Sequence, residues 1–101
     1  MIHDPERVAA IRKRVEAGLA HLQEMEVVKD EEFRRWLSLT RNWFNDIEPT
    51  YLKNLSDEKR NPEEESIWLS GVELSLRITE QQCLRLCDAF KTYGPDLRFM
   101  V

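Results

Sequence analysis

Residues 61–95 read NPEEESIWLSGVELSLRITEQQCLRLCDAFKTYGP, the longest helical pattern in the chain. Asn61 suits a helix N-cap, Pro62 suits the first turn, and three glutamates follow at the positive end of the helix dipole. Gly94 and Pro95 are typical of a helix end. We therefore predict one helix over residues 62–93, about 48 Å long at 1.5 Å per residue.

This predicted helix has two apolar faces, whereas most surface helices have one. A broad face runs along its whole length and consists of Trp68, Leu69, Val72, Leu76, Cys83, Leu86, Cys87 and Phe90. The opposite face is apolar in the first half only and consists of Ile67, Gly71, Leu74 and Ile78. Its four-three-four spacing is that of a helix–helix seam, and the glycine would let another backbone approach closely.

Two explanations of the second face are open. Tyr51, Leu52, Leu55 or the C-terminal tail could cover it within the chain. Alternatively, it could contact another protein, or a second copy running antiparallel across a twofold axis. In that case we expect the acidic residues Glu63, Glu64 and Glu73 to set the register with a basic partner.

Further helical patterns precede this one. Apolar residues at helical spacing predict a helix over residues 5–26, opened by Asp4-Pro5, and a second over 31–47. Pro49 should end or kink the second helix, with a short helical piece over 50–55 and a loop over 56–60. A break near Thr79 in the last helix is the alternative to a continuous one, and we expect the apolar tail 95–101 to be ordered. The prediction is all-α: a single domain over 1–101, an antiparallel bundle of three principal helices.

Composition limits the kind of protein. The 101 residues carry 15 basic and 19 acidic side chains, a net charge of −4, which argues against nucleic-acid binding. No apolar run approaches the roughly 20 residues that span a bilayer, and the N-terminal residues lack the apolar core of a secretory signal. We expect a cytoplasmic protein in which Cys83 and Cys87 are reduced.

Few residues suggest chemistry. The two cysteines share a helix face but lack further ligands, so we interpret them as small buried residues. His21 with Glu24 does not complete a metal-binding set, and we interpret it as solvated. The triplet at 63–65 could bind magnesium, as in all-α nucleotide hydrolases, but its place at a helix start explains it without a ligand.

The arginines of the second helix offer one polar edge. Arg34 and Arg41 could bind a phosphate or an acidic partner, or simply form local ion pairs. We interpret Trp36, Trp43 and Trp68 mainly as core residues, with part of one exposed.

No catalytic residue, metal site or cofactor is predicted. We expect a non-enzymatic, homodimeric interaction protein, acting as a regulator, inhibitor or assembly factor through Ile67, Gly71, Leu74 and Ile78. The alternatives are an oligomeric magnesium-dependent nucleotide hydrolase and a weak nucleic-acid-binding protein.

Overall fold

The computed structural model describes residues 2–57 and 60–98, and every regular element in these ranges is helical. The elements are α1 (Pro5–Glu24), α2 (Glu31–Asp46), the π-helix η1 (Ile47–Leu52), α3 (Lys53–Asp57), α4 (Pro62–Tyr93) and the 3₁₀ helix η2 (Gly94–Asp96). The all-α prediction is confirmed.

The three long helices begin at side-chain caps. Asp4 accepts a hydrogen bond from the backbone N–H of Arg7, and Asp30 does the same for Phe33. The Oδ1 atom of Asn61 accepts from the N–H of Glu64 at 2.8 Å. These caps satisfy backbone donors that the first turn leaves free, which is why the predicted starts agree with the structure.

The α-helix α2 ends at Asp46, close to the predicted end at 47, but Pro49 does not end the helical path. The chain passes from α2 through η1 into α3 without leaving a helical path, and the N–H of Lys53 bonds to the carbonyl of Glu48. Proline lacks the N–H that an α-helix needs, and the wider π turn accommodates that loss. As a result, residues 31–57 form one column long enough to lie along α4.

The possible break in the last helix is also absent. α4 is one helix from Pro62 to Tyr93, and the hydroxyl of Thr79 donates to the carbonyl of Ser75 instead of capping a new helix. Gly94 then ends α4 with a φ of 61°, a conformation that glycine adopts without a Cβ clash.

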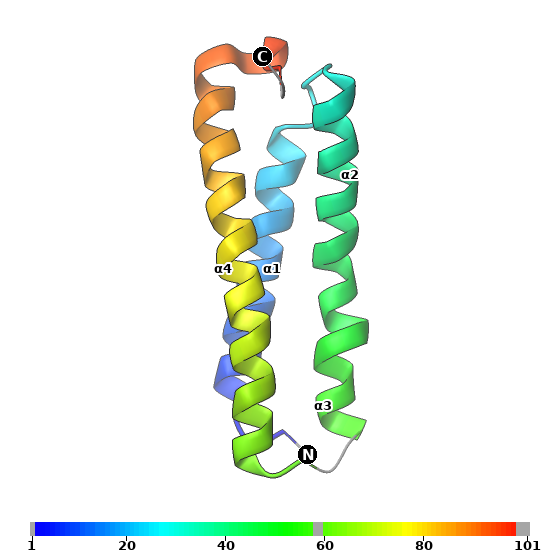
Figure 1. The fold of residues 1–101 in the computed structure, drawn as a ribbon, viewed down its shortest axis with the longest axis vertical. Helices are drawn as coiled ribbons and strands as arrows, with labels where there is room; N and C mark the ends of the chain where they lie inside the picture. Colours follow the sequence, from blue (N-terminus) through cyan, green and yellow to red (C-terminus); the bar gives the residue numbers. More distant parts are fainter. Residues whose placement is uncertain (1, 58–59, 99–101) are drawn as a thin grey trace.

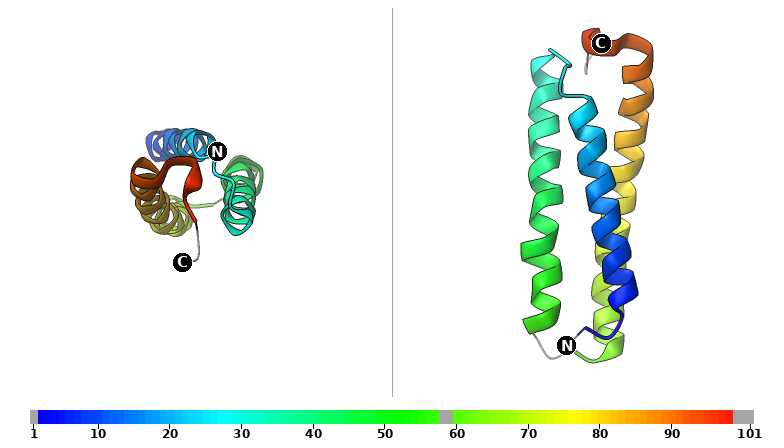
Figure 2. Two further views of the ribbon diagram at one scale, coloured as in Figure 1. Left: turned by 90° about the horizontal axis from the view of Figure 1, so that it is seen from above. Right: turned by 180° about the vertical axis from the view of Figure 1, so that it is seen from behind.

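α1, α2 and α4 lie side by side along the long axis of a molecule measuring 49 × 19 × 18 Å (Figure 1). α1 and α2 run antiparallel, as predicted, and α4 runs in the same direction as α1. Viewed along the axis, the three helices lie at the corners of a triangle, and from behind α1 lies in front, between α2 and α4 (Figure 2). The core is formed mainly by Val8, Ile11, Leu22, Met25, Phe33, Phe44, Ile47, Leu52, Leu55, Leu69 and Leu76, all at most 1% exposed.

Ion pairs join α1 and α4 in their parallel register. Arg7 pairs with Glu73, and two turns further along Arg14 pairs with Glu80. Hydrogen bonding to these glutamates raises the pKa of both arginines. Half-exposed pairs contribute modestly, about 0.5–1 kcal/mol each, so they fix register more than stability.

The C-terminal tail is anchored as far as it is described. Leu97 is buried, and the carbonyl of Pro95 accepts from the N–H of Lys29 at the α1–α2 connector. η2 therefore turns back over the end of the helices (Figure 2). The remainder of the predicted tail, residues 99–101, lies outside the described residues, as do residues 58–59 of the predicted loop; residues 56–57 belong to α3.

Candidate functional site

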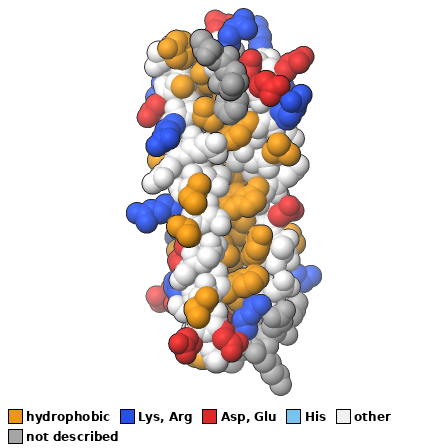
Figure 3. Space-filling model, in the orientation of Figure 1, with side chains coloured by type: hydrophobic (Ala, Val, Ile, Leu, Met, Phe, Trp, Pro, Cys, Tyr) orange, Lys and Arg blue, Asp and Glu red, His pale blue; other side chains and the backbone are white. Residues whose placement is uncertain are grey.

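The second apolar face of α4 is exposed. We call Ile67, Gly71, Leu74 and Ile78 the α4 ridge; its three large side chains are 70%, 58% and 62% exposed, respectively. Leu52, Leu55 and Leu97 are instead buried in the core, and Tyr51 lines a groove beside α4, so among the described residues none of the expected side chains covers this face. Hydrophobic side chains gather along this side of the molecule, over α4 and beside it (Figure 3).

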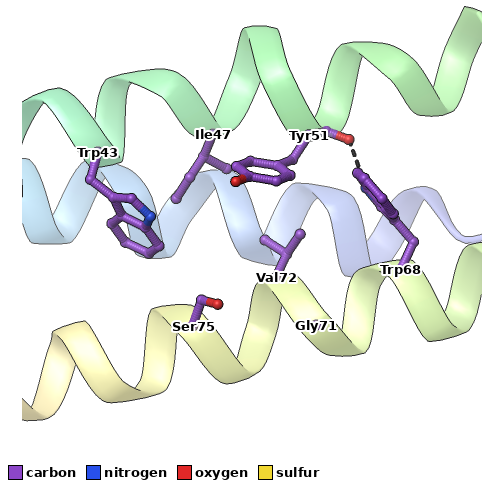
Figure 4. A pocket seen from close by; sticks show the side chains of 7 residues that line it. All are labelled: Trp43, Ile47, Tyr51, Trp68, Gly71, Val72 and Ser75. Atoms are coloured by element: carbon purple, nitrogen blue, oxygen red, sulfur yellow. Dashed lines mark hydrogen bonds between the residues drawn. The ribbon is translucent and has the colours of Figure 1, made fainter.

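A groove lies next to the ridge, between α4 and the part of the chain that forms α2 and η1. This aromatic groove has a volume of about 190 Å³ and is lined by Trp43, Ile47, Tyr51, Trp68, Gly71, Val72 and Ser75 (Figure 4). Gly71 belongs to both surfaces. Among the described residues, no atom outside the local helix backbone lies within 4 Å of where its Cβ would stand, so the groove opens directly onto the ridge.

The π-helix shapes one wall of the groove. Tyr51 belongs to η1, and its backbone carbonyl accepts a hydrogen bond of 2.9 Å from the indole Nε1 of Trp68 on α4 (Figure 4). The two rings lie 5.9 Å apart at 45°, and the Arg60 guanidinium stacks 4.6 Å from the Trp68 ring centroid. These contacts hold both aromatic rings at the groove wall.

The tryptophans combine core packing with partial exposure. Trp36 and Trp43 pack on Phe33 and Phe44, with ring centroids 5.6 Å and 5.2 Å apart. All three tryptophans are half-buried. The groove was not predicted, because tryptophans at helical spacing indicate core residues; Pro49 within an aromatic-rich helix is the feature of the sequence that marks its position.

The acidic residues expected to accompany the ridge have different positions. Glu63 is exposed, and Glu64 accepts from the Asn61 side-chain amide. Glu73 bonds to Arg7 with contacts of 2.5 Å and 3.3 Å, so it faces α1 on the other side of α4. We therefore remove Glu73 from the expected contact surface.

The third glutamate of the triplet has a structural role that the sequence did not reveal. Glu65 is 2% exposed, and its carboxylate accepts hydrogen bonds from the backbone N–H groups of His3 and Asp4 at 2.8–3.0 Å. It ties the N-terminal residues to the start of α4. Within residues 2–57 and 60–98, no three histidine, cysteine or acidic side chains gather as metal ligands would.

The arginine edge of α2 is engaged locally. Arg34 donates to the carbonyls of Glu26 and Val28 at 3.0 Å and 3.1 Å, and Arg41 pairs with the Glu26 carboxylate. Both side chains therefore stabilise the α1–α2 connector, Arg41 through a local ion pair and Arg34 through backbone carbonyls.

The cysteines are buried, with Cys83 2% and Cys87 9% exposed. Burial raises the pKa of the Cys83 thiol to about 11, and burial is also the main cause of the raised pKa of Cys87. Thiols react as thiolates, so both are poorly reactive at neutral pH.

His21 is half-buried beside Gly18 and Cys83.

Comparison with models of protein families, with curated proteins and with solved structures gives no match for this chain. None of the helices in the described part of the chain combines the length and apolar character needed to cross a bilayer.

Proposed function

We propose that this protein is a non-catalytic protein-interaction module whose recognition surface is the α4 ridge together with the aromatic groove. It acts as a regulator, inhibitor or assembly factor by covering an apolar helix face. The observation that carries this proposal is the exposure of Ile67, Leu74 and Ile78 on an unbroken helix, each at 58% or more.

The apolar surface is continuous from the ridge into the groove. Single exposed apolar residues are ordinary, but a contiguous apolar patch marks a contact surface. Here the ridge continues through Gly71 into a groove with two tryptophans and a tyrosine. Those residue types dominate binding energy at protein interfaces, because they bury a large rigid area.

The shape suits a helix as the bound element. An exposed ridge with seam spacing beside an apolar groove is the arrangement that accepts the apolar face of an amphipathic helix. The surface around it is acidic at one end, with Glu63 and Glu64 in the first turn of α4. A bound helix with a basic residue at that end would be favoured.

Photo-crosslinking tests the proposal in cells. A photo-crosslinking phenylalanine analogue replaces Ile78 on the ridge in one variant and Leu84 in the matched control. Leu84 belongs to the same helix and is 54% exposed, but it lines a hollow against Gly18 and His21 of α1. We expect a discrete protein adduct from position 78 that is absent from position 84.

The adduct should also disappear when Leu74→Glu is added to the position-78 variant. Identical products from both positions, or none from position 78, would contradict the proposal. Circular dichroism of each purified variant confirms that helix content is unchanged.

A further inference from the structure

We infer that the α4 ridge is occupied by the α4 ridge of a second copy of this chain, running antiparallel about a twofold axis. This inference rests on the proposed function and names its partner. It draws on two observations: the residue order of the ridge and the charges at its two ends.

The ridge is complementary to itself in one antiparallel register. When Ile67 lies level with Ile78 of the second copy, Gly71 lies level with Leu74 of that copy. The twofold axis repeats both pairings. At one level Ile67 and Ile78 face each other as two large apolar side chains. At the other, Leu74 faces Gly71, which has open space around it. A large residue facing a small one lets two helices approach closely and interdigitate.

The charges select the antiparallel direction. The acidic residues Glu63 and Glu64 lie at the start of α4, and Arg85 lies beyond the ridge at its other end, where it is exposed. In this register Arg85 of one copy lies about 4.5 Å further along the axis than Glu63 of the other, three residues at 1.5 Å each. Helix side chains lean toward their own N-terminus, so Glu63 and the opposing Arg85 lean toward each other.

A parallel pair has the reverse electrostatics. It would place Glu63 beside Glu63 of the second copy and Arg85 beside Arg85, and like charges across a seam are unfavourable. It would also place Gly71 opposite Gly71, so that no large side chain fills that level of the seam. Both features therefore favour one arrangement of two copies.

Solution mass is the first test, by light scattering and sedimentation equilibrium on the full chain. The monomer mass is 12.1 kDa. We expect a concentration-dependent shift to twice that mass. Leu74→Glu should raise the dissociation constant about a hundredfold, because it buries two charges in an apolar seam. The control Leu84→Glu should leave the constant unchanged.

Charge reversal tests the direction. Arg85→Glu should weaken the dimer about tenfold, equivalent to about 1.4 kcal/mol, because two opposite-charge contacts become repulsive. Combining it with Glu63→Arg should recover most of the affinity. Glu63 is chosen because the Glu64 carboxylate already bonds to Asn61. In a parallel dimer, Arg85→Glu only exchanges one like-charge pair for another and would have no effect.

Failure of this inference is distinguishable from failure of the proposed function. A wild-type chain that remains monomeric to about 1 mM, the range of the weakest specific complexes, would refute self-association. So would a dimer that is insensitive to Leu74→Glu. If the adduct from position 78 then contains a different protein, the proposed function stands without the second copy.

Discussion

Two glycines, Gly18 and Gly71, provide a pair of identical substitutions with opposite expected effects. Both lie inside long α-helices, where alanine is favoured over glycine by about 0.5–1 kcal/mol. Gly71→Ala meets no contact among the described residues, so it should stabilise the isolated chain by that amount. The helix contribution is the same for Gly18→Ala, and the difference between the two variants isolates the packing contribution.

At Gly18 the packing contribution is unfavourable. An added Cβ would stand 2.7 Å from Cε1 and 2.9 Å from Cε2 of the Phe44 ring, and closer still to Cζ. Phe44 is completely buried, so its ring cannot swing into solvent. Overpacking of this kind costs about 1–3 kcal/mol. Subtracting the helix gain leaves a net loss of about 1–2 kcal/mol, so the two variants should differ by roughly 2 kcal/mol.

Urea unfolding followed by circular dichroism measures both variants, with midpoints converted to free energies at a common slope. The measurements should be made at several protein concentrations, because any dimer adds stability that depends on concentration. At about 4 °C per kcal/mol, the melting temperatures should differ by several degrees. If Gly18→Ala stabilises the chain as much as Gly71→Ala, the close packing of α1 on Phe44 is refuted.

Three further predictions concern the buried Glu65 carboxylate, the half-buried Trp68 indole and the buried Cys83 thiol. Glu65→Gln should lower the unfolding free energy by about 1–2 kcal/mol, because the charged acceptor of backbone N–H groups is lost; amide exchange at residues 3 and 4 should accelerate while α4 stays protected. Trp68→Phe should cost about 1 kcal/mol in urea unfolding, because the carbonyl of Tyr51 loses its donor. The pKa of Cys83 is raised from 9.0 to about 11. The buried neutral thiol therefore contributes to the unfolding free energy in full below pH 9, and this contribution is lost as the pH rises through 11. The thiol ionises first in the unfolded chain, so Cys83→Ala should show a smaller loss over that range.

The helix starts and the long last helix could be predicted because their causes are local. A cap such as Asp30 or Asn61 acts within three residues of itself, and the structure shows both bonds. The long last helix is likewise predicted from the spacing of apolar residues within 62–93, without information from other parts of the chain. Short-range causes of this kind can be read from one sequence without knowledge of the packing.

The response to Pro49 could not be predicted in the same way. A proline in a helix can produce an end, a kink or a π turn, and the sequence around it allows all three. The π turn persists where the column of α2 and α3 packs alongside the rest of the fold, with Ile47 and Leu52 buried. It is also where Trp68 reaches the carbonyl of Tyr51. The formation of a π turn at Pro49 therefore depends on a contact between residues 17 positions apart, which no local sequence pattern can reveal.

The role of the glutamate triplet shows the same limit. In the amino-acid sequence the three glutamates at 63–65 are equivalent, and the preference for acidic residues at a helix start explains all of them. In the structure only Glu65 turns inward, because it lies on the core side of α4 close to the N-terminal residues. The prediction of a shared role was therefore too coarse.

The spacing of the α4 ridge is not explained by the fold itself. The buried residues of α4, among them Leu69, Leu76 and Cys83, lie on the opposite side of the helix and account for its packing against α1. Packing within the described chain does not require large apolar residues at four-three-four intervals on this exposed face, followed by Gln81 and Arg85. The repeat matches what a second helix requires, and it ends where a second copy would place its acidic first turn. The proposed contact between two chains would account for this repeat, which the packing of one chain does not explain.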